Sequence, residues 1–396
     1  QATLLMPVYV TCWLGNDGIS SASTPTRLGF SDSGEPRRYS SPAGNAKVRV
    51  GTSCTLGTPG KSKTGLSSLM VTPNTFTTGN RKVGSKLTGK RIAFCAKKTD
   101  RSRLKDKEKS IREEERYDLI GDVHGHLDLL TALCEKLGYV QKGLGFEHPK
   151  GRKLIFVGDL VNRGPDSSGV LETVRKTWEE GNAFVTLGNH EFRILQLADQ
   201  KKSLPDPKYE TFVPWLKRLP LFLDLEEIRV VHAAWHISSI ALISRSPVPD
   251  HSFIQATSVK DSPERKAVDR ILKGVKANLP PGSVLRDRFG VARPKGRLRW
   301  WENLRGKPFS KALYSQMYGD SLEEIPDPKD IEQVEPYPKE DKTVFIGHYC
   351  LEKHIPKIND NVVCIDGCVT CDKQLWGYRH TGEKTPAEAN LIHAEY

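Results

Sequence analysis

The stretch YDLIGDVHG, residues 117–125, decides the fold of this chain. Four residues with strand character lead into a glycine, and an aspartate and a histidine that can hold a metal ion follow it. The same order recurs in KLIFVGDLVNRG (153–164) and in AFVTLGNHE (183–191). Residues at the carboxyl ends of strands in an open α/β sheet converge on one crevice. The three stretches therefore predict one shared site.

Two later strands end in the same way. VVHAAW (230–235) places His232 directly after a strand, and FIGHY (345–349) places His348 after another. The oxygen and nitrogen donors collected in this way suit a pair of divalent first-row metals and do not suit a thiolate zinc site. A shared carboxylate would hold two metals roughly 3.5–4 Å apart, a spacing that serves to activate water and to neutralise a phosphoryl group.

The rest of the pattern predicts an α/β domain with mixed sheets. Segments of strand character alternate with segments in which apolar residues recur at helical spacing. The expected helices are 127–137, 169–180 and 190–198, the expected hairpin is 221–231, and the expected late strands are 344–346, 362–365 and 375–379. The segment 236–341 interrupts this alternation, because it is rich in Pro, Arg and Trp. We expect an insertion or cap over the site there, with a helix at 264–276.

The composition changes sharply before residue 116. Ser, Thr, Gly and Pro occupy 43 of the first 90 positions, and such a segment cannot bury enough apolar surface to offset chain entropy. Residues 1–116 contain 21 Lys/Arg and 9 Asp/Glu, so the whole net charge of +12 lies there. We predict a disordered basic extension over 1–115 and a folded domain over 116–396. The extension is an unstructured leader, a start site placed too far upstream, or an arm that binds nucleic acid.

Several other features bound the class of protein. No run approaches the ~18 apolar residues of a membrane helix, and no secretory leader is recognisable. The eight cysteines lack the spacing of a secreted scaffold, which favours a reducing, cytoplasmic setting.

Three local features have alternative interpretations. Cys368 and Cys371 form a CxxC pair with Cys364 nearby, and the alternatives are reduced cysteines on a strand pair or a structural zinc site. The Trp300-Trp301 pair packs in the core or offers a base-stacking platform. Asp366 is expected to be a turn residue.

The motifs GDVHG, GDLVNRG, GNHE, HAAW and GHY, in this order, resemble the calcineurin-like metallophosphoesterases. Within them the chain is similar to the PPP-type branch of bacterial serine/threonine phosphatases and symmetrical diadenosine tetraphosphatases. The resemblance covers about residues 117–380. It implies a four-layer α/β/β/α sandwich with a two-metal site at the ends of the sheets. It also implies that a hydroxide bridging the metals attacks phosphorus in line, without a covalent intermediate.

The resemblance implies a role for each polar residue of the motifs. The implied ligands are Asp122, His124 and the bridging Asp159 for the first metal, and Asp159, Asn189, His232 and His348 for the second. The metals are expected to be manganese, with iron, zinc, nickel or cobalt as alternatives. His190 would be the general acid and Arg163 a clamp for phosphate oxygens. A second phosphate-binding arginine is expected before the last histidine, with Arg299 as the candidate and Arg288 as the runner-up.

Two departures from the eukaryotic-like protein phosphatases concern the substrate. Those enzymes carry Asp at the position of Asn162, where it pairs with the general acid. The sequence after GNHE reads FRIL and lacks their LRG form. Both differences place protein specificity in doubt and leave the metal ligands untouched.

Three functions are therefore weighed. The first is a serine/threonine protein phosphatase acting on a phosphoprotein. The alternative is a symmetrical bis(5'-nucleosyl)-tetraphosphatase acting on a nucleoside polyphosphate. The third is a catalytically idle protein whose basic extension holds nucleic acid, and the intact ligand set argues against it. No membrane partner is expected for any of the three.

Overall fold

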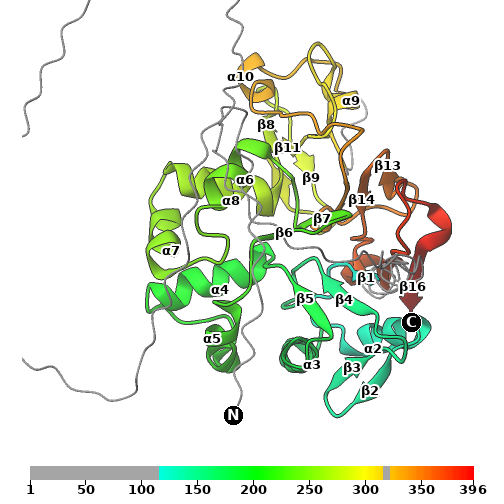
Figure 1. Ribbon diagram of the computed structural model, residues 1–396. Helices are drawn as coiled ribbons and strands as arrows, with labels where there is room; N and C mark the ends of the chain where they lie inside the picture. Colours follow the sequence, from blue (N-terminus) through cyan, green and yellow to red (C-terminus); the bar gives the residue numbers. More distant parts are fainter. Residues whose placement is uncertain (1–115, 315–321) are drawn as a thin grey trace, which may run out of the picture. The chain divides into compact units, whose positions relative to one another are not determined.

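The computed structural model describes residues 116–314 and 322–396 of the chain (Figure 1). The predicted basic extension, 1–115, lies outside the described residues. In the part that the structure describes, no helix is long and apolar enough to span a bilayer.

Two five-stranded mixed sheets form the centre of the domain. The first has the order β16-β15-β1-β4-β5, and β1 pairs in parallel with β4 and antiparallel with β15. Its strands are β1 (Tyr117–Ile120), β4 (Lys153–Phe156), β5 (Ala183–Val185), β15 (Gln374–Arg379) and β16 (Leu391–Glu395). The second has the order β13-β14-β12-β7-β6. Its strands are β6 (Phe222–Asp224), β7 (Ile228–Val231), β12 (Thr343–Ile346), β13 (Ile358–Asn359) and β14 (Val362–Cys364).

The two sheets are held together by side chains that alternate along their strands. In β4, Ile155 belongs to an apolar cluster shared by both sheets, whereas Leu154 and Phe156 belong to the larger core outside it. This alternation follows from the two-residue period of a strand, which sends successive side chains to opposite faces. The shared cluster contains Tyr117, Leu119, Ile155, Val157, Ile228, Val230, Phe345, Val363, Ile365 and Tyr378. Both faces of the central strands are mostly apolar because both are buried, and the buried Asp118 of β1 is paired with Arg152.

Helices cover the outer face of the first sheet. α2 (Leu127–Lys136) and α3 (Ser167–Glu179) begin just after the motif loops that follow β1 and β4. α3 is capped by Asp166, whose side chain accepts a hydrogen bond of 2.8 Å from the amide of Gly169. α4 (Asn189–Asp199) begins inside the third motif. The predicted strand–helix alternation and the mixed sheets are confirmed, with ends that differ by no more than three residues.

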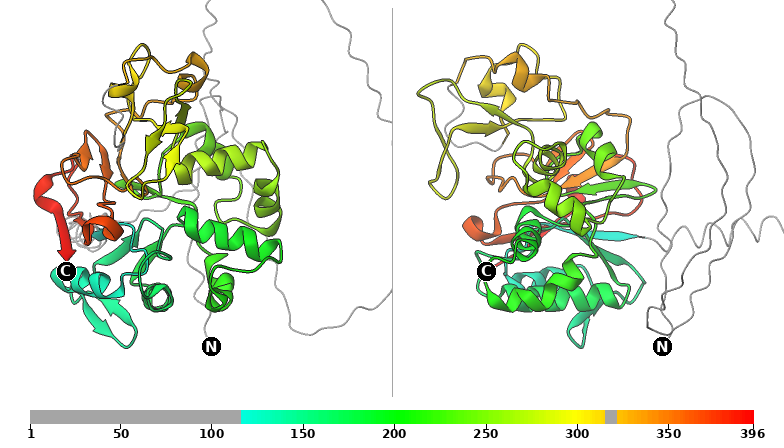
Figure 2. Two further views of the ribbon diagram at one scale, coloured as in Figure 1. Left: turned by 180° about the vertical axis from the view of Figure 1, so that it is seen from behind. Right: turned by 90° about the vertical axis from the view of Figure 1, so that its left-hand side faces the viewer.

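Among its described residues, the insertion 236–341 contains three helices of seven residues or more and two short β-ribbons. The helices are α6 (Ile237–Ile243), α7 (His251–Ser258) and α8 (Pro263–Lys273). The ribbons pair β8 (Lys276–Asn278) with β11 (Lys295–Arg297), and β9 (Leu285–Arg286) with β10 (Ala292–Arg293). The views of Figures 1 and 2 agree that these ribbons lie on the opposite side of the two sheets from α2 and α3. The predicted helix 264–276 exists but ends at Lys273, because Gly274 adopts a φ of 74°.

The outer face of the second sheet packs against this insertion. Arg229 of β7 donates a 2.8 Å hydrogen bond to the hydroxyl of Tyr337, and its guanidinium lies 4.9 Å from the ring of Trp235. Trp300 and Trp301 are only 1% and 6% exposed, which confirms core packing over a base-stacking platform. The short elements that complete the fold are β2 (Val140–Lys142), β3 (Gly145–Glu147), η1 (Pro207–Phe212), α5 (Val213–Leu216), α9 (Phe309–Ala312), α10 (Pro328–Ile331), α11 (Val369–Asp372) and η2 (Glu388–Asn390).

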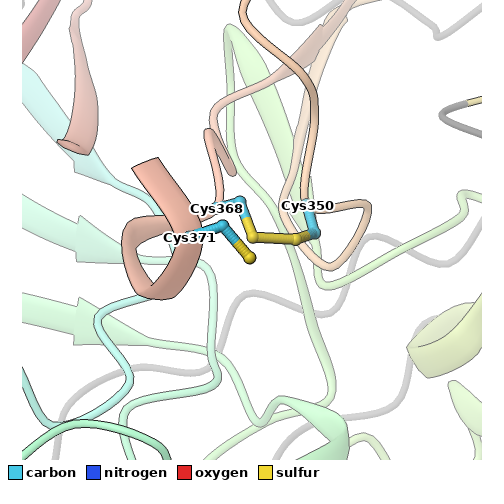
Figure 3. Close-up of side chains that lie close together, drawn as sticks. All are labelled: Cys350, Cys368 and Cys371. Atoms are coloured by element: carbon cyan, nitrogen blue, oxygen red, sulfur yellow. A yellow bond between two sulfur atoms is a disulfide. The ribbon is translucent and has the colours of Figure 1, made fainter. Parts of the chain in front are cut away.

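The expectation of reduced cysteines on a strand pair is wrong for Cys368. Its sulfur forms a disulfide with that of Cys350, which joins the loop after β12 to the start of α11 (Figure 3). Cys371 stands beside this disulfide, with the three sulfur atoms within 4.8 Å of one another. Only Cys364 of the expected group lies on a strand, where it is a buried free thiol. Cys350 and Cys368 lie in two separate loops that the fold brings together, so their spacing in the sequence does not reveal the disulfide.

Candidate functional site

The five motifs meet at one edge of the two sheets. Within the described residues, two groups of potential metal-binding side chains share Asp159: one adds His124 and His190, and the other adds His232 and His348. In each group the potential ligand atoms lie within 4.8 Å of one another. The structure therefore brings His124, Asp159, His232 and His348 of the predicted ligands together, and it adds His190, which the sequence assigns as the general acid, to the first group in place of Asp122.

Asp159 is the centre of this cluster. Its Oδ2 atom lies 3.3 Å from Nε2 of His232, 3.8 Å from Nε2 of His124 and 3.9 Å from Nε2 of His190. Its other oxygen, Oδ1, accepts a 3.0 Å hydrogen bond from the amide of His190. That amide stands in the first turn of α4, where backbone N–H groups favour a negative charge. The carboxylate is 1% exposed, so water contributes little to its solvation.

Two histidines have their tautomers set by backbone carbonyls. Nδ1 of His124 donates to the carbonyl of Val161 at 3.0 Å, and Nδ1 of His232 donates to the carbonyl of Val157 at 2.9 Å. In the neutral ring this arrangement leaves the Nε2 lone pair facing the cluster, which is the usual way in which a metal-binding imidazole is oriented.

The donor set fits a pair of cations. Nε2 of His232 lies 3.3 Å from Oδ2 of Asp159 and 3.3 Å from Oδ1 of Asn189. Although burial acts in the opposite direction, Asp159 raises the pKa of His232, so the negative charge of this site already attracts a positive one. Nε2 of His348 is buried and has no hydrogen-bond partner among the described residues. Such an arrangement is unfavourable unless a positive charge compensates it. Divalent first-row metals prefer this mixture of carboxylate, amide and imidazole donors.

The charges of the cluster shift the pKa values of its members in opposite directions. Burial and the neighbouring charges of Asp366 and Asp159 raise the pKa of Asp122 well above its usual range. Burial would also raise the pKa of Asp159, but His232, His190 and His124 outweigh it and hold that pKa well below its usual range. Burial lowers the pKa of His124 to about 3. The ring of His124 is therefore neutral, as a metal ligand must be.

The motif glycines are required by close packing. A Cβ atom on Gly188 would lie 2.2 Å from Oδ1 of Asp159, and one on Gly347 would lie 2.0 Å from Oδ1 of Asp122. No side chain fits at either position without displacing a carboxylate. These two glycines therefore allow the backbone to approach the predicted ligands directly.

Five polar residues of the site have a left-handed backbone. The residues and their φ values are His124 (46°), Asp159 (51°), Asn162 (69°), Arg163 (73°) and His348 (70°). This conformation is uncommon for residues other than glycine, and it clusters at functional sites where the surrounding fold imposes it.

Glu191 is a functional residue whose role the sequence reasoning missed. Its buried carboxylate accepts hydrogen bonds from four backbone amides: those of Asp159 (2.8 Å), Leu160 (2.8 Å), Val161 (3.3 Å) and Gly188 (2.9 Å). It thus ties the loop after β4 to the start of α4. A glutamate at the third position of a helix, three residues after Gly188, is the capping signal that could have revealed it.

His190 lies in a short hydrogen-bond chain. Nδ2 of Asn162 lies 2.7 Å from Nδ1 of His190, and the hydroxyl of Tyr209 donates to Oδ1 of Asn162 at 3.1 Å. Burial is the largest influence on His190, and its pKa is lowered although Asp159 acts in the opposite direction. Asn162 therefore orients the ring without adding a charge to it.

The arginines predicted to clamp phosphate lie in different settings. Nη1 of Arg163 donates to Nε2 of His124 at 2.9 Å, so this guanidinium stands at the cluster. Arg299 is directed elsewhere: its Nε donates to the carbonyl of Leu313, and its Nη1 lies 3.7 Å from Glu302.

The runner-up arginine is also engaged. Arg288 makes a two-point contact with Asp372, at 3.0 and 2.6 Å. Arg297, which the sequence reasoning did not single out, lines the same cavity as Asn189 and His348. The structure thus brings Arg297 and the runner-up Arg288, but not Arg299, to the wall of the site.

Asp366 does more than close a turn. It accepts a 2.8 Å hydrogen bond from the amide of Cys368, as a turn residue would, and a 2.6 Å bond from the amide of Cys350. It is 4% exposed, and its charge contributes to the raised pKa of Asp122. It therefore belongs to the buried negative charge of the site.

The sequence profile of the calcineurin-like phosphoesterases matches residues 116–364. The chain belongs to this family. Its members are hydrolases, so this calcineurin-like phosphoesterase is an enzyme of that class. The matched segment contains all five motifs, the whole second sheet and the strands β1, β4 and β5 of the first, including every potential metal ligand described above.

Curated relatives match this phosphoesterase over shorter segments. An asymmetrical bis(5'-nucleosyl)-tetraphosphatase PrpE of Oceanobacillus iheyensis is 30% identical over 34% of this chain and 58% of its own length. The enzyme of the same name from Geobacillus thermodenitrificans is 50% identical over 29% of this chain and 55% of its own length. The chain thus spans about half the length of these relatives. A solved serine/threonine phosphatase of Saccharomyces cerevisiae is 14% identical, with a TM-score of 0.37 over 72% of this chain and 81% of that one.

Proposed function

We propose that the chain is a metal-dependent hydrolase of bis(5'-nucleosyl) tetraphosphates, which it cleaves asymmetrically with water to a nucleoside triphosphate and a nucleoside monophosphate. The observation that carries this proposal is the cavity beside the Asp159 cluster. It has a volume of about 320 Å³, and eight of its lining side chains are Lys or Arg. A monoester presents one phosphate to such a wall, whereas a tetraphosphate bridge presents four in a row.

The names of the relatives support the same choice. The tetraphosphatases that match at 30% and 50% identity are named for asymmetrical cleavage. They favour our alternative expectation over the protein phosphatase, although they differ from the symmetrical cleavage expected from the motifs.

The residues of the cluster divide into the ligands of two metal ions. We propose that Asp122, His124 and Asp159 hold one metal and that Asp159, Asn189, His232 and His348 hold the other. A pair of divalent metals supplies charge neutralisation at phosphorus and an activated water. Manganese suits the oxygen and nitrogen donors, with iron, zinc, nickel and cobalt as outcomes that metal analysis would reveal.

The remaining side chains act on the substrate. Arg163, which reaches the edge of the cluster, is placed to bind phosphate oxygens, and charge-assisted contacts of this kind are strong. His190, oriented by Asn162, is placed to donate a proton from Nε2 to the leaving oxygen.

The test is a comparison of substrates with manganese added. We expect diadenosine tetraphosphate to be turned over faster than a phosphoserine peptide, with ATP and AMP as products separated by ion-exchange chromatography. Two molecules of ADP would show symmetrical cleavage. A higher kcat/KM for the phosphopeptide would restore the protein phosphatase and refute the proposal. The matched control is His232→Asn, which removes a proposed ligand and should abolish both reactions.

A further inference from the structure

The β8–β11 ribbon of the insertion has one apolar face and one basic face. In its antiparallel register, Lys276 lies opposite Arg297, Lys295 lies opposite Asn278, and Gly296 lies opposite Ala277. Gly296 and Ala277 are buried, and a Cβ atom on Gly296 would lie 2.2 Å from a methyl carbon of Leu313. Because side chains alternate along a strand, packing of that face against the insertion leaves the three cations together on the other.

This pairing of like charges is unfavourable by itself. Cations directly opposite one another on a β-ribbon repel and destabilise it. Consistent with this, burial and the charge of Arg297 lower the pKa of Lys276 to about 8. A fold that keeps such a pair needs a compensating negative charge.

The residues that the structure describes place no paired carboxylate on this face. Three other cations of the cavity are paired with carboxylates: Lys273 lies 2.6 Å from Asp269, Arg288 lies 2.6 Å from Asp372 and Arg293 lies 2.7 Å from Asp287. Among residues 116–314 and 322–396, Lys276, Lys295 and Arg297 have no carboxylate within salt-bridge distance. Nε of Arg297 is buried and has no hydrogen-bond acceptor in the same part of the chain. The basic face is thus built for an anion that comes from outside.

The basic face lines the cavity that reaches the cluster. Lys276, Lys295 and Arg297 share this cavity with His190 and His348. Asp287, already paired with Arg293, is the single carboxylate among the lining residues that the structure describes. An anion that extends from the cluster along this wall would therefore meet several cations in succession.

We propose that the β8–β11 face binds the phosphates that are not attacked, so that Lys276 and Lys295 select a linear chain of at least three phosphates over a single phosphate ester. This subsite rests on the proposed function, because the chain of phosphates is anchored at the same cluster. It recognises the phosphates themselves, and inorganic tripolyphosphate therefore has the chemistry needed to occupy it.

The experiment compares Lys276→Gln/Lys295→Gln with the unchanged chain. A contact between a lysine and a phosphate is a charge-assisted hydrogen bond, so each loss should weaken binding about tenfold and the pair about a hundredfold. The kcat/KM for diadenosine tetraphosphate should fall by about that factor. The kcat/KM for p-nitrophenyl phosphate, which has one phosphate, should stay within about twofold. The matched control is Lys311→Gln, an exposed lysine of α9 in the same insertion that does not line the cavity.

A binding measurement separates this proposal from the proposed function. Isothermal titration calorimetry with inorganic tripolyphosphate, on protein treated with EDTA, should show tight binding by the unchanged chain and by Lys311→Gln, and weak binding by the double variant. The double variant should also melt at a higher temperature than the unchanged chain without anion, because repulsion across the ribbon is relieved.

Three outcomes decide the question. Equal tripolyphosphate affinity in the double variant would overturn the subsite, and so would an equal loss of activity toward p-nitrophenyl phosphate. If the chain failed to hydrolyse diadenosine tetraphosphate but still bound tripolyphosphate through Lys276 and Lys295, the proposed function would fail and the subsite would stand.

Discussion

Glu191→Gln should destabilise the protein severely, because one carboxylate holds four backbone amides. Oε1 accepts from Leu160 and Val161, and Oε2 accepts from Asp159 and Gly188. Glutamine keeps one oxygen and turns an NH₂ group toward the other two amides. Two hydrogen bonds to a charged acceptor are then lost, each worth about 1.5–3 kcal/mol, so unfolding should become easier by about 3–6 kcal/mol. That is a large part of the roughly 5–15 kcal/mol that stabilises a typical domain.

The assay is urea unfolding at pH 8 in EDTA. Burial and the charge of Asp159 raise the pKa of Glu191 to about 7, so the side chain is ionised at this pH. EDTA removes metal from both proteins, which prevents a change in metal affinity from appearing as a change in stability. The control is Glu172→Gln, an exposed glutamate of α3, for which we expect a change within about 0.5 kcal/mol. A loss below about 1 kcal/mol for Glu191→Gln, with an unchanged m value, would refute the reasoning.

Three further predictions concern the metals, the extension and the general acid. Asp159→Asn should abolish turnover and lower bound metal to one equivalent or less, and two full equivalents by elemental analysis would remove Asp159 as the bridge. A chain that begins at Glu114 should keep full activity toward p-nitrophenyl phosphate while its pI falls toward neutrality; loss of activity would show that residues 1–113 are required. Asn162→Asp places a carboxylate beside His190, which favours the imidazolium and raises its pKa, so the alkaline limb of the pH–rate profile for phenyl phosphate should move to higher pH. His190→Ala should slow phenyl phosphate more than p-nitrophenyl phosphate, and equal slowing would assign the proton to water.

The fold could be predicted where local patterns specify it. β1 begins and ends at the predicted residues, because an apolar run is followed at once by a glycine and a polar motif. β16 was not predicted, although it pairs along the edge of the first sheet with β15. Its sequence, LIHAE, is too short and mixed to show a period, and only its neighbour makes it a strand. The three-residue strands β8 and β11 were missed for the same reason.

The site could be predicted as a set of motifs but not as a set of contacts. His124 and His348 follow strands, and strand ends converge, so their neighbourhood was readable from the sequence. The choice between Arg297 and Arg299 depends on where β11 ends, since Arg299 lies beyond it and bonds to Leu313. No local pattern specifies that end. The four amides held by Glu191 likewise come from two loops that only the folded sheet brings together.

The left-handed backbone at five polar residues limits how this site could be transplanted. Each such residue other than glycine costs roughly 1–2 kcal/mol, and asparagine and aspartate lie at the low end. Arg163 has no such preference, and a peptide carrying the motifs alone would relax to ordinary φ values, so that the metal-binding side chains would no longer lie together. A designer who grafts the motifs must therefore also import the two sheets and the Glu191 anchor. The smallest part of the protein that can be transferred with the site intact is therefore the whole two-sheet domain.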